Sequence, residues 1–255
     1  MESLYSRNRI YLTPEQQEII RSTRILLGGA GLGSEIAECA LRLGFEKITI
    51  IDGDKIELSN LNRQNYTRED IGRHKAETLA IRLLSINPDA DISFHNDYIC
   101  AENINNLVKD FDIAINALDF KDDTPVIFDE RCRQLGTYSI HPYNFGWGGM
   151  VMIVSPDGLT LKNMMKDGNP ANFELTMAKY IDGYSQFWNI LENKWFHDVV
   201  TAYSKEESKL PIPQLSVGAW ITAGLTVNAM VELILGHEVK LCPKFYVASL
   251  LSDRN

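Results

Sequence analysis

A glycine-rich loop that follows a short apolar run limits most strongly what this chain can fold into. The loop extends from Gly28 to Gly33; it follows the apolar segment 24–28 and precedes a helical pattern from about Leu32 to Leu43. Glycines allow a tight turn and a close approach to phosphate oxygens, and a helix N-terminus presents free N–H groups and a partial positive charge to them. The order strand, glycine loop, helix therefore predicts a phosphate-bearing ligand, held mostly by backbone, at this loop.

The segments that follow this loop predict an α/β sheet. Strands are expected at 47–51, 91–95 and 113–117, with a helix from about His74 to Ile86 between the first two. Strands that alternate with helices at this spacing form a mostly parallel sheet covered on both faces. A strand signal at 147–154 then leads into a turn and indicates an antiparallel addition. The predicted fold class is α/β, a Rossmann-like doubly wound, mostly parallel sheet with antiparallel C-terminal strands and a helical, aromatic-rich insertion.

The 255 residues are expected to form a single domain, 1–255, with a variable helical segment at about 160–213. This segment lacks clear sheet signals, and Gly183 is expected to divide it into two helices. Its large apolar side chains recur at steps of three or four residues, which is typical of a helix face. We interpret this stripe as packing on the domain or on a second subunit; a peptide-binding groove is the alternative. The stripe consists of Phe173, Met177, Tyr180, Tyr184, Trp188, Leu191, Trp195, Val199 and Tyr203.

The composition argues against several other classes of protein. A formal net charge of −9 argues against a protein that wraps DNA, which would need a basic face. The N-terminal residues contain no apolar run of the kind found in signal peptides, so a cytoplasmic location is expected. The apolar stretch 216–235 contains Asn228, Glu232 and several small residues, and it predicts a buried helix rather than a membrane span.

The four cysteines stand at positions 39, 100, 132 and 242 without any C-x-x-C pair. This scattered arrangement argues against a disulfide framework and against a local zinc site. We therefore expect four free cysteines that pack as small apolar residues, and no bound zinc.

An aspartate at the end of the second predicted strand strengthens the nucleotide prediction. Asp52 stands about 20 residues beyond the glycine loop, where an acidic residue of this fold accepts hydrogen bonds from ribose hydroxyls. At this point NAD, FAD and ATP all fit the pattern.

The residues that follow Asp52 favour a triphosphate as the ligand. Asn60, Arg63 and Lys75 follow the second strand, at the sheet edge where ligands of open α/β sheets bind. A guanidinium and an ammonium there would neutralise a triphosphate more naturally than an uncharged nicotinamide. The alternative for these cations is surface ion pairing with Glu69, Asp70 or Glu77.

The chain as a whole resembles the E1-like superfamily of MoeB, ThiF, HesA and ubiquitin-activating enzymes. The resemblance rests on Y-S-R-N at Tyr5, the glycine loop, the block D-G-D…S-N-L-N-R-Q from Asp52 to Gln64, and G-R-H-K ending at Lys75; it continues with I-N-P at Ile86, A-L-D ending at Asp119, and N-A-M-V-E from Asn228.

This resemblance implies a homodimer and a set of ATP-binding residues. They are Gly28, Gly31, Gly33, Asp52, Asp54, Asn60, Arg63, Gln64 and Lys75. Asp119 matches the aspartate that holds Mg²⁺. Arg7 matches an arginine that reaches into the partner subunit's site. Catalysis would then depend on Arg7, Arg63, Lys75 and Asp119, and on positioning and charge neutralisation more than on acid–base chemistry.

The resemblance also implies the reaction and its partners. A substrate carboxylate attacks the α-phosphate of ATP and gives an acyl adenylate and pyrophosphate. The expected substrate is the C-terminal glycine of a small ubiquitin-like or sulfur-carrier protein. A peptide, a modified tRNA base, a non-catalytic scaffold and a NAD-dependent oxidoreductase are the alternatives.

The sequence departs from the family pattern in four places. Ala30 replaces a loop glycine, which is a mild change if its φ stays negative. After Asp119 the residues are Phe-Lys-Asp-Asp-Thr-Pro, where the family usually has asparagine or serine and then an arginine. The paired C-x-x-C motifs that bind zinc in many bacterial members are absent. The segment 160–213 contains no cysteine, so the chemistry is expected to stop at the adenylate without a thioester.

Overall fold

The computed structural model describes residues 4–165, 173–188, 194–206 and 210–250. These residues form a sheet of seven strands in the order β3-β2-β1-β4-β5-β6-β7. The strands are β1 Arg24–Gly28, β2 Lys47–Ile51, β3 Asp91–His95, β4 Ile113–Asn116, β5 Tyr138–Asn144, β6 Gly149–Val154 and β7 Tyr246–Ala248. The pairs from β3 through β5 are parallel, and β6 and β7 add to the sheet in antiparallel pairs. The predicted fold class is confirmed.

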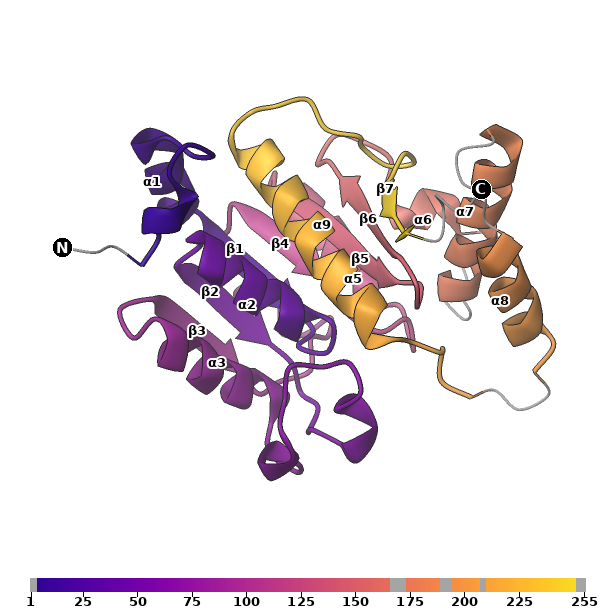
Figure 1. The fold of residues 1–255 in the computed structure, drawn as a ribbon, viewed down its shortest axis with the longest axis horizontal. Coiled ribbons are helices and arrows are strands. Elements are labelled where there is room, and N and C mark those ends of the chain that lie inside the picture. The colour runs from indigo at the N-terminus through magenta and orange to yellow at the C-terminus, as the bar shows by residue number, and fades with distance from the viewer. Residues whose placement is uncertain (1–3, 166–172, 189–193, 207–209, 251–255) are drawn as a thin grey trace.

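Helices cover both faces of the sheet (Figure 1). On the near face lie α1 Pro14–Ser22, α2 Gly33–Leu43, α3 Lys75–Ile86 and α9 Ser216–Ile234. The far face carries α4 Ile104–Leu107 and α5 Thr124–Gln134, whose apolar side chains pack on β1 and β4 in a second core cluster. The main core lies between the sheet and the near-face helices, where Leu27, Ile48 and Ile50 are buried against Ile36 and Leu79.

The aromatic-rich segment forms a layer at one end of the sheet, next to β6 and β7 (Figure 1). It contains α6 Leu161–Met164, α7 Phe173–Trp188 and α8 Lys194–Ser204. The first part of the predicted stripe packs on the domain, because Phe173 and Met177 are buried and the Tyr184 ring lies 5.1 Å from that of Phe245. Farther along, Trp188 is 59% exposed. Leu191 lies outside the described residues.

The prediction that Gly183 divides the segment is wrong. Helix α7 continues through Gly183, and a Cβ at this position would meet no atom within 4 Å. An open helix surface tolerates glycine at a modest cost in helix propensity, so this residue does not end the helix. α7 ends five residues later, at Trp188.

Helix α9 is, within the described part of the chain, the helix that is long and apolar enough to span a membrane. One side of it packs on α2, β5 and β6, with Ala219, Ala223 and Met230 buried. This is the packing of a core helix, as the sequence predicted. Its other side exposes Val217 and Trp220.

Candidate active site

The glycine loop lies at the point where the strand order of the sheet reverses. The chain leaves β1 for β2 and β3 on one side and returns to β4 on the other side of β1. Ligands of open α/β sheets bind in the crevice at the carboxyl ends of such strands. Here the loops after β1 and β4 are in contact, because a Cβ on Gly29 would lie 2.4 Å from the carbonyl oxygen of Ala117. Gly29 also has a φ of +93°, so this position requires glycine for two reasons.

The rest of the glycine loop leads into the N-terminus of α2, which begins at Gly33. A Cβ on Gly31 would come within 3.1 Å of the Gln64 amide nitrogen, and one on Gly33 would lie 2.8 Å from a methyl group of Leu27. Gly31 therefore keeps the loop surface open, and Gly33 allows α2 to pack closely on β1. The φ of Ala30 is not positive, so alanine is tolerated at this loop position, as expected. The Oε1 atom of Gln64 is buried and accepts no hydrogen bond from the described residues.

Asp52 connects the second strand to the glycine loop. Its Oδ2 accepts a hydrogen bond of 2.6 Å from the backbone N–H of Ala30, and its Oδ1 accepts one of 2.7 Å from that of Asp54. Burial raises the pKa of this carboxyl, although Lys75 and the two backbone donors act in the opposite direction. The sequence assigned Asp52 to a ribose; the structure adds a second role, which is to fix the loop. Each oxygen keeps a lone pair for a further donor.

Lys75 is the first residue of α3, and its side chain is turned inward. Only 7% of the residue is exposed, and its Nζ lies 3.0 Å from the Oδ2 of Asp54. The hydroxyl of Tyr98 donates to the other oxygen of Asp54 at 2.9 Å. Lys75 thus pairs with Asp54 rather than with Glu69, Asp70 or Glu77, the surface partners considered above. Tyr66 joins this cluster to the glycine loop, because its hydroxyl hydrogen-bonds to the backbone oxygens of Ala30 and Lys75.

Arg63 follows the short 3₁₀ helix Leu58–Asn60, in which the Asn60 amide oxygen accepts a hydrogen bond from the backbone N–H of Glu57. The Nε of Arg63 donates to the side chain of Gln214 at 2.9 Å, and its Nη1 donates to the side chain of Asn62 at 2.8 Å. Burial lowers the pKa of the Arg63 guanidinium, and the nearby carboxyl groups of Asp119 and, when ionised, of Glu35 oppose this shift. Arg63 therefore lies between the loop after β4 and the start of α2.

The residues after Asp119 contact both its carboxylate and the core of the protein. Asp119 is 66% exposed, and the Nζ of Lys121 lies 3.0 Å from its Oδ2. This hydrogen bond and the carboxylate charge raise the pKa of Lys121. Phe120 points into the core, 4.6 Å from the ring of Phe173, and its backbone N–H donates to Glu174. Helix α7 therefore supports the loop that carries Asp119.

Glu35 is a buried acid at the start of α2 that the sequence did not single out. Only 1% of it is exposed, and Ser34 donates a hydrogen bond of 3.1 Å to its Oε2. Burial raises the pKa of Glu35 to about 8. The side chain is therefore mostly protonated at neutral pH, so a negative charge is absent from a helix end that would face phosphates.

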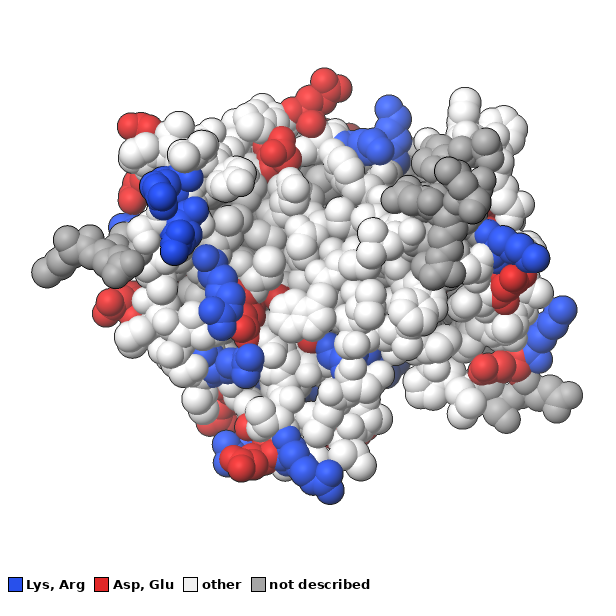
Figure 2. All heavy atoms as spheres, in the orientation of Figure 1, with Lys and Arg blue, Asp and Glu red and all other residues white. Residues whose placement is uncertain are grey.

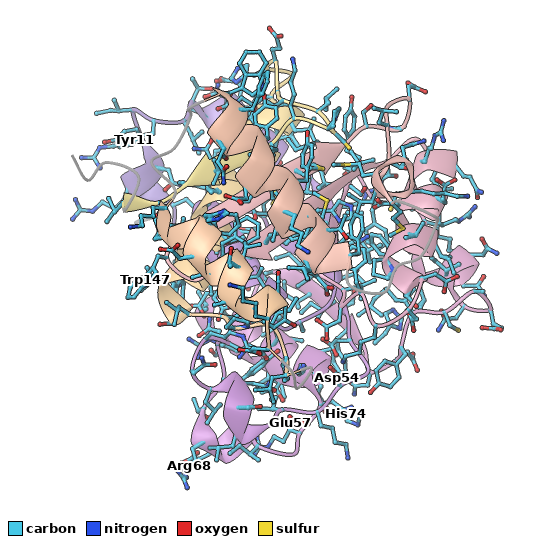
Figure 3. All side chains as sticks on the ribbon, turned by 90° about the vertical axis from the view of Figure 1, so that its right-hand side faces the viewer. Tyr11, Asp54, Glu57, Arg68, His74 and Trp147 are labelled. Atoms are coloured by element: carbon cyan, nitrogen blue, oxygen red, sulfur yellow. The ribbon has the colours of Figure 1, made fainter. Side chains whose placement is uncertain are left out.

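Arg7 is the predicted site residue that the structure does not bring to the others. It lies in the 3₁₀ helix Ser6–Asn8, whose Asn8 donates a hydrogen bond of 2.8 Å to the backbone oxygen of Leu43. Leu43 ends α2, whereas the glycine loop lies at the start of α2. Figure 3 shows the neighbouring Tyr11 at the opposite end of the molecule from Asp54 and His74. Arg7 therefore cannot reach the site of its own chain.

No group of three or more His, Cys, Asp or Glu side chains that could hold a metal ion occurs among the described residues. A single carboxylate such as that of Asp119 is enough for Mg²⁺ when substrate phosphates and water molecules supply its other ligands. Sequence reasoning missed Glu35, Tyr98, Lys121 and Gln214 in this region. Lys121 gave a weak signal because it stands two residues after Asp119, and Tyr98 and Gln214 gave none.

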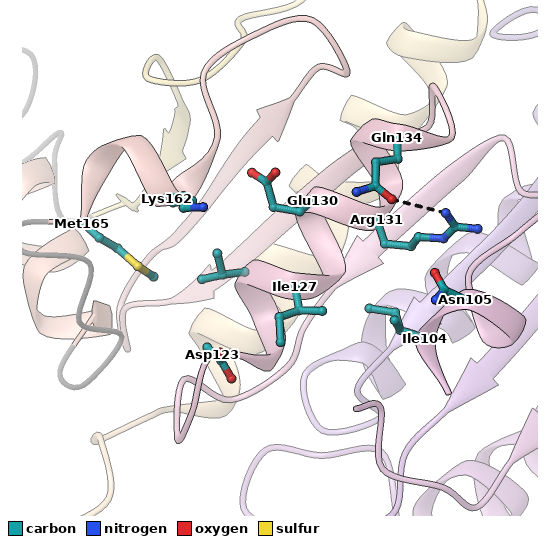
Figure 4. A pocket seen from close by; sticks show the side chains of 10 residues that line it. Ile104, Asn105, Asp123, Ile127, Glu130, Arg131, Gln134, Lys162 and Met165 are labelled. Atoms are coloured by element: carbon teal, nitrogen blue, oxygen red, sulfur yellow. Dashed lines mark hydrogen bonds between the residues drawn. The ribbon is translucent and has the colours of Figure 1, made fainter. Parts of the chain in front are cut away.

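A separate hollow of about 360 Å³ lies on the far face of the sheet, between α4, α5 and α6 (Figure 4). Ile104, Ile127 and Met165 line it together with charged side chains, and Gln134 accepts a hydrogen bond of 3.3 Å from Arg131 there. None of the predicted site residues lines this hollow.

The chain shares sequence with curated enzymes over part of its length. It is 31% identical over 176 residues to the sulfur carrier protein ThiS adenylyltransferase of Bacillus subtilis, an alignment that covers 67% of this chain and 52% of that protein. It is 29% identical over 158 residues to the SAMP-activating enzyme E1 of Haloferax volcanii, which covers 60% of this chain and 58% of that protein. The chain thus spans little more than half the length of these relatives.

Structure and family comparisons agree with this relationship. The fold matches that of E. coli MccB with ATP at a TM-score of 0.69, over 98% of this chain and 72% of that one, and at 16% identity the likeness concerns the fold alone. The model of the ThiF family matches residues 5–254, a range that includes the glycine loop, the Asp52–Gln64 block, Lys75 and Asp119. The chain therefore belongs to the ThiF family.

Proposed function

We propose that this protein is an adenylyltransferase that uses ATP and Mg²⁺ to activate a carboxylate. One observation supports this most directly: the connection between β2 and α3 places two cations, Arg63 and Lys75, beside a glycine-lined helix N-terminus. Lys75 is buried beside Asp54, and Tyr66 bridges its backbone to that of Ala30 in the loop. Such an arrangement suits a triphosphate far better than a nicotinamide. Membership of the ThiF family and the adenylyltransferase names of the relatives agree with it.

In this proposal each residue has a role that follows from its place. Gly28, Gly31 and Gly33 leave room for phosphates at the start of α2, and Gln64 and Asn60 flank them. Asp52 accepts hydrogen bonds from the ribose, and Asp54 orients Lys75. A carboxylate oxygen of the substrate attacks the α-phosphorus, the bond to the β-phosphate oxygen breaks, and pyrophosphate leaves. Arg63 and Lys75 neutralise the charge on the phosphates throughout.

Asp119 would hold the Mg²⁺ that accompanies ATP. When bound, this ion would draw charge from the phosphates and orient them. Lys121 shares the carboxylate in the structure, so the ammonium group must move aside when the ion binds. If it does not, the protein binds nucleotide without catalysis; this contact is the reason to keep the non-catalytic scaffold as the second candidate. No zinc is proposed.

We also propose a homodimer in which Arg7 acts in the partner's site. The distance of Arg7 from its own glycine loop supports an action in trans. The outer side of α9 offers a surface for such contact, because Val217 and Trp220 are exposed and the area over α9 is mostly uncharged (Figure 2). Apolar patches of this kind often mark contacts between subunits.

The proposed substrate is the C-terminal glycine of a small ubiquitin-like or sulfur-carrier protein. The names of the relatives support a carrier protein, since they refer to ThiS and SAMP. A peptide and a modified tRNA base are the alternatives. The segment 160–213 contains no cysteine that could form a thioester, so the proposed reaction ends at the acyl adenylate. We place this reaction in the cytoplasm, without DNA or a membrane as a partner.

The test is exchange of labelled pyrophosphate into ATP with candidate carrier proteins that end in Gly-Gly. Exchange that requires both Mg²⁺ and a carrier would support the proposal. Asp119→Asn and Arg63→Ala should then reduce exchange by about 10²-fold or more, as loss of a group that stabilises developing charge does. Binding of ATP and a carrier without exchange would select the scaffold, and binding of NADH but not ATP would refute a nucleotidyl transferase.

A further inference from the structure

The segment 210–215, which we call the strap, leads directly into α9 and has the sequence Leu-Pro-Ile-Pro-Gln-Leu. Side chains from separate parts of the chain hold its backbone. The hydroxyl of Tyr203 donates to the oxygen of Leu210 at 3.1 Å, and the amide of Asn144 donates to the oxygen of Leu215 at 2.9 Å. The amide of Asn62 donates to the oxygen of Gln214 at 3.3 Å. Together these bonds fix the strap beside the loop that carries Arg63.

The side chain of Gln214 is directed at Arg63, 151 positions earlier in the sequence. Its Oε1 accepts the Nε–H of Arg63 at 2.9 Å, while the Nη1 of Arg63 donates to Asn62 and to the backbone oxygen of Ser59. Two edges of a planar guanidinium are thereby fixed, which also fixes the direction of its third edge. No described residue accepts a hydrogen bond from the Nη2 of Arg63. The guanidinium of Arg63 is therefore oriented, and its Nη2 hydrogens remain available for a ligand.

An amide side chain is a suitable partner for orienting an arginine that must keep its positive charge. A carbonyl oxygen holds the Nε–H without cancelling the positive charge, whereas a carboxylate would form an ion pair and reduce the attraction for phosphates. Ion pairing is what Lys75 shows with Asp54. Arg63, by contrast, has no carboxylate within ion-pair distance among the described residues.

We propose that Gln214 is a positioning residue that holds Arg63 with its Nη2 edge free for the phosphates of the nucleotide. The proposal rests on the function proposed above. It adds that the position of the strap determines whether Arg63 is oriented toward the phosphates. Any movement of the strap that withdraws Gln214 releases Arg63. Because Tyr203 of α8 holds the strap at Leu210, contact of a partner with that helix can change nucleotide affinity without touching the nucleotide.

Gln214→Ala and Gln214→Glu test this, with affinity for Mg-ATP measured by calorimetry. Gln214→Ala should weaken binding about tenfold, the usual effect of losing a hydrogen bond to a charged group. Gln214→Glu should weaken ATP binding at least as much and AMP binding less, because it neutralises the cation that meets the outer phosphates. In a double-mutant cycle, Gln214→Ala should have little further effect on Arg63→Ala. Additive losses would overturn the proposal.

Gln134→Ala is the matched control. It removes a glutamine that accepts a hydrogen bond from an arginine, Arg131, at the hollow on the far face of the sheet (Figure 4). ATP affinity should not change in this variant. Thermal unfolding of all variants identifies any loss that comes from misfolding.

A measurement without nucleotide separates this proposal from the proposed function. With ¹⁵N-labelled arginine, the Nε–H resonance of Arg63 should be protected from exchange in the wild type and lose protection in Gln214→Ala but not in Gln134→Ala. Unchanged protection overturns the positioning role even if ATP binds. Lost protection in a protein that does not bind ATP leaves the contact established and refutes the nucleotide function.

Discussion

At the scale of single residues, the contact between Lys121 and Asp119 predicts the response to magnesium. The ammonium lies 3.0 Å from the carboxylate that would hold the ion. Lys121→Met removes this competitor, so half-maximal pyrophosphate exchange should need about two- to fivefold less Mg²⁺, in keeping with a weak exposed ion pair. Lys162→Met, at the far-face hollow, is the control and should leave the magnesium dependence unchanged. A higher magnesium requirement in Lys121→Met would show that the lysine assists binding.

Glu35 predicts how stability depends on pH. Burial raises its pKa in the folded protein from an ordinary value of 4.5 to about 8. A raised pKa means that the folded state holds a proton that the unfolded state releases, so this contribution is complete below the unfolded value and is lost as pH rises through the folded value. Urea unfolding should show stability falling from about pH 5 to about pH 8. Glu35→Gln should flatten this part of the profile; an unchanged slope would assign it to other groups.

At the scale of secondary-structure elements, a buried polar cluster joins α5 to the sheet. Asp129 on α5 accepts hydrogen bonds from Ser139 at 2.7 Å and from Asn116 at 3.2 Å, and its Oδ1 lies 2.8 Å from the Nε2 of His141. Both Asp129 and His141 are 1% exposed. Asp129→Ala should therefore lower the free energy of unfolding by about 3 kcal/mol or more, because it removes the buried carboxylate that Ser139 and His141 both contact.

Chemical denaturation measures this loss, and Asp123→Ala, just before the start of α5, is the surface control. Asn116 ends β4, three residues before Asp119, and its amide also donates to the backbone oxygen of Pro125. The cluster thus connects the loop of Asp119 to the body of the protein. A stability loss of less than about 1 kcal/mol in Asp129→Ala would show that the cluster contributes no more than an exposed contact.

The same cluster shows why parts of the fold were not visible in the sequence. Strands β1, β2 and β3 were predicted with their observed bounds because each is a short run between turn signals. Strand β5 was missed, since Ser139, His141 and Pro142 do not read as a buried strand. Ser139 and His141 are stable in the core because Asp129 forms hydrogen bonds with them. The sequence around β5 does not indicate this partner, which lies on α5.

The candidate site was predictable to the extent that it is local. The glycine loop, Asp52, Arg63 and Lys75 all lie in the continuous stretch from β1 through α2 and β2 to the start of α3, so their spacing along the chain brought them together. Gln214 reaches Arg63 from a segment far along the chain, and Phe120 is held by α7. These contacts depend on how distant elements pack, which sequence periodicity does not encode.

At the scale of the whole molecule, the position of Arg7 predicts that two chains share each site. Arg7→Ala and Asp119→Asn should each be nearly inactive alone. When the two are mixed and allowed to exchange subunits, half of the dimers are mixed and each contains one complete site, so about a quarter of wild-type activity should return. Pyrophosphate exchange before and after mixing measures this. If activity stays at the level of the separate variants, Arg7 does not act in trans.

The contact of Gly29 with Ala117 also limits how the protein can vary. Any side chain at position 29 would collide with the backbone of the loop after β4, which no rotamer change relieves. Substitution at position 117 cannot compensate, because the colliding atoms belong to its backbone. In a saturation library selected for folded protein, position 29 should therefore accept glycine alone, while the neighbouring Ala30 tolerates other small residues. The least variable position of the loop is therefore determined by the contact between the loops that follow β1 and β4, independently of any ligand.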